Sequence, residues 1–276
     1  MTSPAHWVEV HRLAVAGREP VIARDVGHRV GRVWLRTSRF ADVAALARAT
    51  LTLGPDAGAL YDLGWAESST GQPRQALTHY EQALNLYRET GHSANEAATL
   101  ASIGAVYNNL GERQQALAYF QQALPTMREV GDRAGEATTL NNIGLVYNNL
   151  GERQQALAYY QQALPIRREV GDRAGEATTL NNIGLVYNNL GERQQALAYY
   201  QQALPTMREV GDRAGEAVTR YNIAMIHRAN EDLDRAIGEL ELVVDLDRQV
   251  EHPDLVSDTA MLEKVRHERT QNRGET

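Results

Sequence analysis

Asparagines are concentrated in a ten-residue stretch that the chain contains twice. NNIGLVYNNL runs from Asn141 to Leu150 and again from Asn181 to Leu190. The amide group offers a hydrogen-bond donor and an acceptor to a peptide bond, without the desolvation cost of a charge. Asparagine is a weaker helix former than alanine, so four of them in one helix cost about 2 kcal/mol. This cost indicates that the asparagines have a binding or structural role.

Residues that carry out catalysis or hold metals do not form known patterns in this chain. It has no cysteine, which excludes disulfides, thiolate metal sites and cysteine nucleophiles, and Lys264 is its only lysine. It lacks the GxxxxGK[ST] loop, HExxH, GxSxG and a glycine-rich dinucleotide loop. The eight histidines share no ligand spacing, and paired carboxylates such as Asp245 and Asp247 fit solvated helix faces. We predict no enzymatic activity, no metal and no cofactor.

The composition is that of an ordinary cytosolic protein. Of the 276 residues, 43% are hydrophobic and 23% are charged, which argues against long disordered spans. No apolar run reaches membrane-spanning length, and the N-terminal MTSPAHWVEVHRL lacks the features of a signal peptide. We therefore predict a cytoplasmic location.

Charge is distributed unevenly along the chain, whose formal net charge is -7. Residues 1–55 carry eight arginines against four acids, whereas residues 231–276 carry six basic residues against 13 acids. Solvated helix faces explain this pattern, as would head-to-tail contact between copies or a basic patch for a partner. The acidic balance argues against general nucleic-acid binding.

A period of forty residues organises most of the chain. Residues 137–176 and 177–216 differ at only two positions, Ile166/Thr206 and Arg167/Met207. Residues 97–136 differ from 177–216 at five positions. A fixed period of this size is typical of a solenoid, in which each unit buries its apolar face by stacking on its neighbours.

Each period contains two stripes of apolar residues at helical spacing. The first consists of Leu140, Ile143, Val146, Tyr147 and Leu150, and the second of Ala156, Leu157, Tyr160, Ala163 and Leu164. Gly151 separates the stripes as a helix terminator, and the Gly171–Asp172 junction ends one helix and caps the next. Every period is therefore predicted to be a helical hairpin. Pro165 lies inside the second stripe and predicts a kink or break near residues 161–165.

The combination of small and aromatic residues resembles the tetratricopeptide repeat (TPR), whose motif places one of each on both helices of a hairpin. One copy of this set is Gly144, Tyr147, Ala156 and Tyr160. It recurs as Gly64, Ala76 and Tyr80; as Gly104, Tyr107, Ala116 and Phe120; and as Gly184, Tyr187, Ala196 and Tyr200. The resemblance implies an all-α fold, a right-handed α-α superhelix (TPR solenoid) of about six helical hairpins plus terminal helices.

The resemblance divides the chain into eight segments. We expect an N-terminal helix or remnant of an earlier repeat, a degenerate TPR, four full TPRs, another degenerate TPR, and a capping helix with a frayed tail, QNRGET. Their residues are 1–23, 24–56, 57–96, 97–136, 137–176, 177–216, 217–252 and 253–276.

In TPR arrays the first helix of each hairpin lines a concave groove that holds partner peptides, and the resemblance implies the same here. Asn142 and Asn182 match the position at which many peptide-binding members hold the ligand backbone. The predicted groove residues are Asp62, Trp65, Asn141, Asn142, Leu145, Asn181, Asn182, Leu185, Arg220, Asn222 and Arg228. Of these, Arg220 and Arg228 could bind an acidic group or a C-terminal carboxylate.

Two structural explanations for the asparagines compete with the groove. Asn148 and Asn149 precede Gly151, where asparagine is a natural helix terminator. Asn141 and Asn142 could form a ladder that joins one repeat to the next without any ligand. One comparison favours the groove: four of the five differences between residues 97–136 and 177–216 fall on the predicted groove side of the first helix, at Ala98, Ala101, Ser102 and Ala105.

These observations predict a non-catalytic scaffold that binds a protein or peptide in its groove. The forty-residue units with GDRAGE junctions look like those of animal polarity adaptors, and still more like the C-terminal arrays of bacterial STAND ATPases and caspase-like CHAT proteins. The resemblance implies the sensor or adaptor part of a signalling system, whose catalytic part is elsewhere. The alternatives are a self-associating structural module, which high salt should dissociate, and a peptide-responsive regulator.

Overall fold

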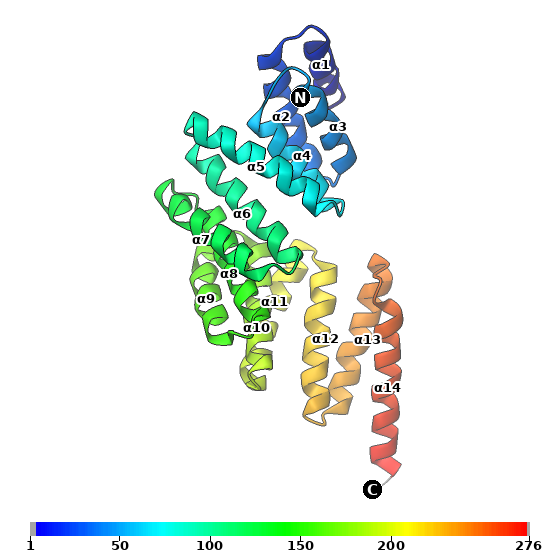
Figure 1. Cartoon of the computed structure of the whole chain (residues 1–276). Helices are drawn as coiled ribbons and strands as arrows, with labels where there is room; N and C mark the ends of the chain where they lie inside the picture. The colour runs from blue at the N-terminus through cyan, green and yellow to red at the C-terminus, as the bar shows by residue number, and fades with distance from the viewer. Residues whose placement is uncertain (1–3, 275–276) are drawn as a thin grey trace. The chain divides into compact units, whose positions relative to one another are not determined.

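The computed structural model describes residues 4–274, which form fourteen helices and no strand (Figure 1). The prediction of an all-α fold is confirmed. The chain forms two compact units, Met1–Gly135 and Glu136–Thr276. Within each unit, the helices that contact each other most are consecutive in the sequence, such as α4 with α5 and α12 with α13. This is the arrangement that a chain of helical hairpins requires.

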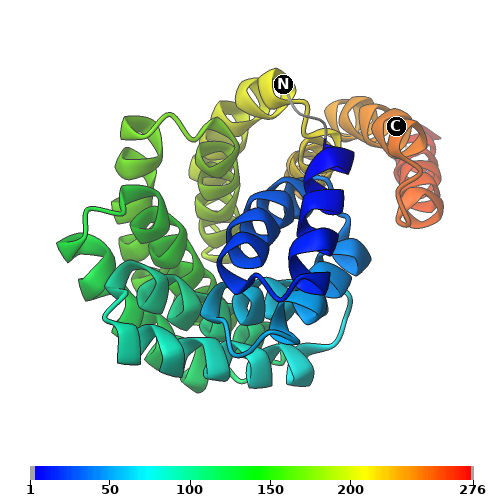
Figure 2. The same ribbon diagram turned by 90° about the horizontal axis from the view of Figure 1, so that it is seen from above.

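The first unit contains seven complete helices. They are α1 (Pro4–Ala16), α2 (Pro20–Arg36), α3 (Phe40–Leu51), α4 (Ala57–Ser69), α5 (Pro73–Thr90), α6 (Ser93–Asn109) and α7 (Arg113–Glu129). Helices α1, α2 and α3 lie side by side, as the dark and light blue ribbons of Figure 2 show. The His11 side chain of α1 is buried and lies 2.8 Å from the Thr50 hydroxyl of α3. Helix α1 thus packs as part of this unit.

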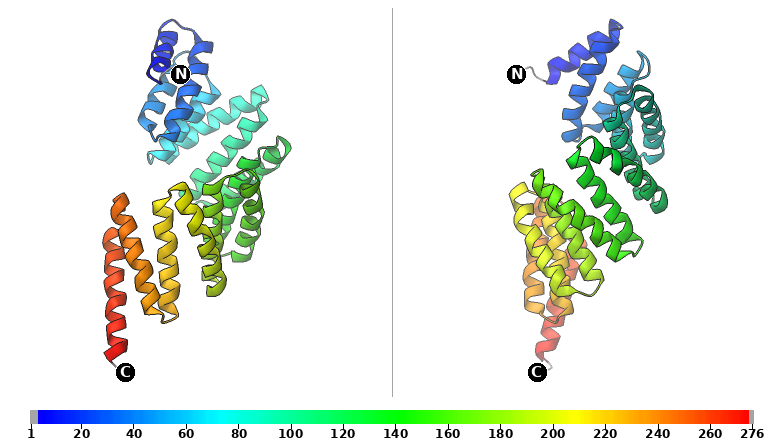
Figure 3. Two further views of the ribbon diagram at one scale, coloured as in Figure 1. Left: turned by 180° about the vertical axis from the view of Figure 1, so that it is seen from behind. Right: turned by 90° about the vertical axis from the view of Figure 1, so that its left-hand side faces the viewer.

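The second unit contains the remaining helices, of which α8 begins in the last residues of the first unit. They are α8 (Arg133–Asn149), α9 (Arg153–Glu169), α10 (Arg173–Asn189), α11 (Arg193–Val210), α12 (Arg213–Ala229), α13 (Leu233–Val250) and α14 (Leu255–Gly274). Helix α13 packs between α12 and α14, as the yellow-to-red ribbons of Figure 3 show. The apolar core that these helices share includes Leu240 and Val244 of α13 and Val265 of α14.

Glycine and aspartate set the helix ends, as predicted. Gly151 follows α8 with a φ of 83°, and Gly171 follows α9 with a φ of 70°, a backbone conformation that glycine adopts without steric cost. Asp172 caps α10 because its carboxylate accepts a hydrogen bond from the Gly175 backbone N–H at 2.9 Å. These turns separate the helices of each hairpin at a fixed interval.

The predicted break near Pro165 is wrong, because α9 is one continuous helix. Helices α7 and α11 likewise continue through Pro125 and Pro205. A proline deprives the carbonyl four residues earlier of its hydrogen bond. Pro165 and Gln161 both lie on the exposed face of α9, so water can satisfy that carbonyl.

Small and aromatic residues bring the two helices of a hairpin together. A Cβ atom added to Gly144 would lie 2.7 Å from the Tyr160 ring, and one added to Gly184 would lie 2.7 Å from the Tyr200 ring. Such contacts are too short for any side chain larger than hydrogen. The rings of Tyr160 and Tyr200 are fully buried, so they fill the space that the glycines leave.

Two boundary predictions need adjustment. Helices α6 and α10 begin at Ser93 and Arg173, four residues before the predicted repeats 97–136 and 177–216. The physical boundary is the turn at a positive-φ glycine, Gly91–His92 before α6 and Gly171–Asp172 before α10, where Asp172 also caps the helix. Of the tail expected to fray, residues 271–274 continue α14, where the Gln271 side chain contacts His267, and residues 275–276 lie outside the described part.

Glu231 occupies the turn that holds a glycine in the preceding repeats, and its φ is 61°. A side chain in this conformation costs about 1 kcal/mol. We expect Glu231→Gly to raise the free energy of unfolding by about 1 kcal/mol in urea denaturation. The reverse change, Gly191→Glu, meets no neighbouring atom within 4 Å of the added Cβ and should lower it by a similar amount. If the free energy of unfolding stayed the same in either variant, the explanation given for Glu231 would be contradicted.

Candidate functional site

The asparagines at positions 141 and 181 join one repeat to the next. The Asn141 carbonyl oxygen accepts hydrogen bonds from the Thr179 hydroxyl at 3.2 Å and from the Asn182 amide at 3.3 Å. The Asn181 carbonyl oxygen accepts a bond from the Thr219 hydroxyl at 2.9 Å. Asn141 is buried and Asn181 is half-buried. These contacts form the ladder between repeats, and they leave both carbonyl groups engaged.

The neighbouring predicted asparagines lie beside this ladder. Asn142, Asn182 and Asn222 occupy the same place in three successive repeats, and all are half-buried. Leu145 and Leu185, one turn further along their helices, are also half-buried. The structure therefore divides the asparagines by contact: the carbonyl oxygens of 141 and 181 accept hydrogen bonds from the next repeat, and 142, 182 and 222 are the half-buried residues beside them.

Arg220 and Arg228 already have acidic partners within the second unit. The Arg220 side chain is only 7% exposed and pairs with Glu216 and Glu239. Burial opposes ionisation of Glu216, but hydrogen bonds from Arg208 and Arg220 outweigh it and lower the pKa of Glu216. A ligand carboxylate would have to displace these partners, so the structure does not favour Arg220 as a groove residue.

Arg228 is held by the terminal helix. Its guanidinium donates two hydrogen bonds to Glu268 of α14, at 2.6 and 2.9 Å. This bidentate pair is the strongest geometry for an arginine and a carboxylate. Arg228 therefore fastens α14 to α12, and its charge is already matched.

The ladder predicts a stability difference between adjacent asparagines. Asn141→Ala removes two hydrogen bonds from a buried amide, so we expect a free energy of unfolding lower by about 1–2 kcal/mol. Asn142→Ala is the matched control on the same helix, and we expect it to change stability by less than about 0.5 kcal/mol. Denaturant titration of both variants measures the difference. Equal losses would contradict the division of the asparagines.

A pocket of about 260 Å³ lies within the first unit. Its walls come from α2, α4, α6 and the end of α5, and thus mainly from the first helices of consecutive hairpins. The lining residues are His28, Arg32, Leu35, Gly58, Tyr61, Asp62, Trp65, Tyr87, Asn95 and Ala98. We call it the Trp65 pocket. It brings together Asp62 and Trp65, the two predicted groove residues of this unit.

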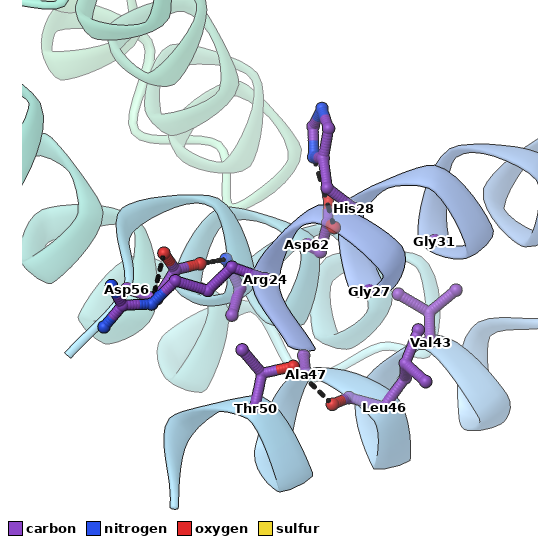
Figure 4. Close-up of a pocket in the computed structure, with 11 residues that line it drawn as sticks. Arg24, Gly27, His28, Gly31, Val43, Leu46, Ala47, Thr50, Asp56 and Asp62 are labelled. Carbon is purple, nitrogen blue, oxygen red and sulfur yellow. Dashed lines mark hydrogen bonds and ion pairs between the residues drawn. The ribbon is translucent and has the colours of Figure 1, made fainter. Parts of the chain in front are cut away.

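The buried carboxylate of Asp62 receives no hydrogen bond from the part of the chain that the structure describes. The Asp62 side chain is 9% exposed, and Nδ1 of His28 lies 4.0 Å from Oδ2 (Figure 4). Burial lowers the pKa of His28, which disfavours its cationic form. Gly31 makes room for the Asp62 carboxylate, because a Cβ there would lie 2.9 Å from Oδ2. Burial raises the pKa of Asp62 to about 7, and the charge of Asp56 adds to this rise.

Aromatic rings form the apolar side of the Trp65 pocket. Trp65 is 43% exposed, which is unusual for so large an apolar residue. Its ring meets that of Tyr61 edge to face at 6.1 Å, and the Tyr61 hydroxyl lies 3.0 Å from that of Ser102. The tyrosine is thereby fixed, whereas one face of the tryptophan remains available.

Some residues of this pocket were not predicted. His28 and Arg32 belong to the degenerate first repeat. The TPR motif is weak there, so the sequence did not place these two residues on the first helix of a hairpin. Tyr87 belongs to a second helix, α5, and Asn95 lies in the first turn of α6. The predicted solvated position of Asp247 is wrong, because its side chain is 1% exposed, whereas Asp245 is exposed and pairs with Arg248.

Sequence comparison agrees with this architecture. The tetratricopeptide repeat profile matches residues 95–169 and 175–249, and a second profile of the same description matches residues 57–90. The chain belongs to the tetratricopeptide repeat family. Its fold is accordingly an α-α solenoid of TPR hairpins. No curated protein sequence matches it.

Solved TPR structures resemble the chain at low sequence identity. The Cut9 and Hcn1 hetero-tetramer of APC/C gives a TM-score of 0.72 at 17% identity, and covers 95% of this chain and 46% of the other. This chain thus spans less than half of that relative. A Rap protein complexed with Competence and Sporulation Factor gives 0.64 at 14% identity, covering 89% and 76%. BtubC from P. vanneervenii gives 0.63 at 20%, covering 76% and 93%. These likenesses establish the fold.

None of the helices in residues 4–274 combines the length and the apolar composition that a membrane span requires.

Proposed function

We propose that this TPR protein is a non-catalytic scaffold that binds a peptide or protein segment, and that the Trp65 pocket is its principal contact. As predicted from the sequence, we place it in the cytoplasm, as the sensor or adaptor part of a bacterial signalling system. Its fold neighbours include a Rap protein bound to Competence and Sporulation Factor and proteins of hetero-oligomers, which supports a binding role.

The observation that carries the proposal is the pairing of an exposed tryptophan with a buried acid. Trp65 offers a wide apolar surface at low entropic cost, as interface residues do. Asp62 holds a carboxylate in the same pocket without a hydrogen-bond donor. The buried carboxylate costs stability in the free protein, and the indole keeps apolar surface in water. A ligand that covers the indole and donates an N–H to the carboxylate would bury this apolar surface and pair the charge.

The half-buried asparagines of the second unit form a second candidate contact surface. Asn142, Asn182 and Asn222 occupy the repeat position of Asp62. Their amides can pair with the backbone of an extended peptide, while the half-buried Leu145 and Leu185 provide apolar contacts beside them. We propose that these residues contribute weaker contacts than the Trp65 pocket, because no bulky exposed side chain accompanies them.

Trp65→Ala tests the proposal. Peptides are selected from a random display library against the full chain, and their dissociation constants are measured with wild type and variant. We expect at least about a tenfold weaker affinity for Trp65→Ala, because a central aromatic residue contributes about 2 kcal/mol or more. Leu242→Ala, which removes another exposed apolar side chain, is the control and should not change the affinity.

Two results would contradict the proposal. One is a set of selected peptides that bind Trp65→Ala as tightly as wild type. The other is the failure of any peptide to be enriched on the folded protein. If large assemblies form instead and dissociate in high salt, the self-associating module becomes the better explanation.

A further inference from the structure

A second pocket, of about 420 Å³, lies among the last three helices. It lies in the second unit and does not depend on the proposed role of the Trp65 pocket. Its lining residues are Ala217, Val218, Tyr221, Asp247, His252, Asp254, Ser257, Asp258 and Met261. We call it the Asp247 pocket. Three of these residues are acids, and neither lysine nor arginine is among them.

Asp247 at the base of this pocket has an unsatisfied carboxylate. Its side chain is 1% exposed, and Oδ2 receives no hydrogen bond from residues 4–274. The nearest basic atom is Nδ1 of His252, 3.9 Å from Oδ1. Asp258 faces the same group, and burial followed by its contact with Asp247 raises the pKa of Asp258 to about 6. A buried carboxylate without a donor is costly unless a cation pairs with it.

An earlier repeat has a guanidinium at the position that corresponds to Asp247. Arg167 stands eighty residues before Asp247, at the same position two repeats earlier. It is buried at 9% exposure and pairs with Asp172, which stands eighty residues before His252. The other three full repeats have Tyr87, Met127 and Met207 there, which are also buried. The inner repeats therefore fill the place with a long side chain of their own, and one of these is a guanidinium.

The last repeat replaces that side chain with the short Asp247, which leaves both space and negative charge. We infer that the Asp247 pocket binds the guanidinium of an arginine side chain in a peptide ligand. Asp247 and Asp258 accept its N–H groups, and the planar fork of arginine suits two carboxylate acceptors. Tyr221 and Met261 contact the aliphatic stem. The acids and His252 do not converge as metal ligands do, since no such group of three occurs in residues 4–274.

The test uses the full chain and three tripeptides, acetyl-Ala-Arg-Ala-amide and its citrulline and lysine counterparts. Binding is followed by chemical shifts of the protein in NMR titrations. We expect the arginine peptide to bind at least about ten times more tightly than the citrulline peptide, which keeps the shape but lacks the charge. Equal affinity for citrulline or for lysine, or no binding of the arginine peptide, would overturn the inference.

Two variants locate the site. Asp247→Asn should weaken binding of the arginine peptide at least about tenfold, and should melt at a higher temperature because a buried charge is removed. Asp245→Asn, which makes the same charge change at an exposed position, should bind as wild type does. Equal losses in both variants would overturn the assignment. If Asp247→Asn folds poorly, Asp258→Asn provides the same comparison, and Trp65→Ala should leave this binding unchanged.

Discussion

Replacing Asp62 with asparagine is expected to raise the free energy of unfolding by about 4 kcal/mol at pH 8 and to change it little at pH 4. The fold already accepts asparagine at this position, since Asn142, Asn182 and Asn222 occupy it in later repeats. The substitution keeps the shape of the side chain and removes its charge. Urea denaturation of both proteins across this pH range measures the effect.

The direction of this pH dependence follows from the raised pKa of Asp62. Burial shifts this pKa from 3.8 in the unfolded chain to about 7 in the folded protein. The stabilisation from the bound proton is complete below the unfolded pKa and is lost as the pH rises through about 7. Above that pH the wild type carries a buried charge and the variant does not.

A pH-independent difference between the two proteins would contradict this account. Asp245→Asn, at an exposed position, is the control and should show little change at either pH. We also expect Asp62→Asn to bind the selected peptides more weakly than wild type despite its higher stability. Gains in both stability and affinity would show that the carboxylate has no binding role.

The second large effect concerns the contact between Gly184 and Tyr200. Gly184→Ala should lower the free energy of unfolding by about 1–3 kcal/mol, because its Cβ would lie 2.7 Å from a fully buried ring. Alanine would otherwise stabilise the helix by about 1 kcal/mol relative to glycine. Tyr200→Ala should lower it by about 3–5 kcal/mol through loss of the ring. Chemical denaturation gives these values.

A double-mutant cycle isolates the contact. With the ring removed, the added methyl group has room, so Gly184→Ala combined with Tyr200→Ala should cost no more than Tyr200→Ala alone. Tyr200→Phe is the matched control, because it keeps the ring, and Phe120 holds this place in another repeat. The Tyr200 hydroxyl has no hydrogen-bond partner among the described residues, so this change alone should be nearly neutral. Simple additivity of the glycine and ring changes would argue against the contact.

The helices and their packing could be predicted because local chemistry determines them. Gly151 and the Gly171–Asp172 junction specify helix ends through backbone conformation and capping, whatever the neighbours are. The contact between Gly144 and Tyr160 follows from spacing within one hairpin. Of the kink or break predicted near Pro165, the break does not occur, because Pro165 and Gln161 lie on the exposed face of α9, where water can reach the carbonyl that the proline leaves free.

The site could be predicted only in part, because it depends on how one hairpin is rotated against the next. Spacing on a single helix places Asn141 and Asn142 on adjacent faces, but it does not show that Asn141 meets Thr179 of the following repeat. The local sequence is sufficient to predict that Asp245 and Asp247 differ in exposure. They are about 200° apart around a helix, so both cannot face solvent on an amphipathic helix.

Fluorescence of Trp65 tests the central claim most directly. The double variant Trp7→Phe and Trp34→Phe leaves Trp65 as the only tryptophan, and Trp65 is the most exposed of the three. Titration with a selected peptide should shift its emission to shorter wavelength, with a midpoint equal to the dissociation constant measured by calorimetry. Saturating peptide that leaves the emission unchanged would contradict a binding site at Trp65.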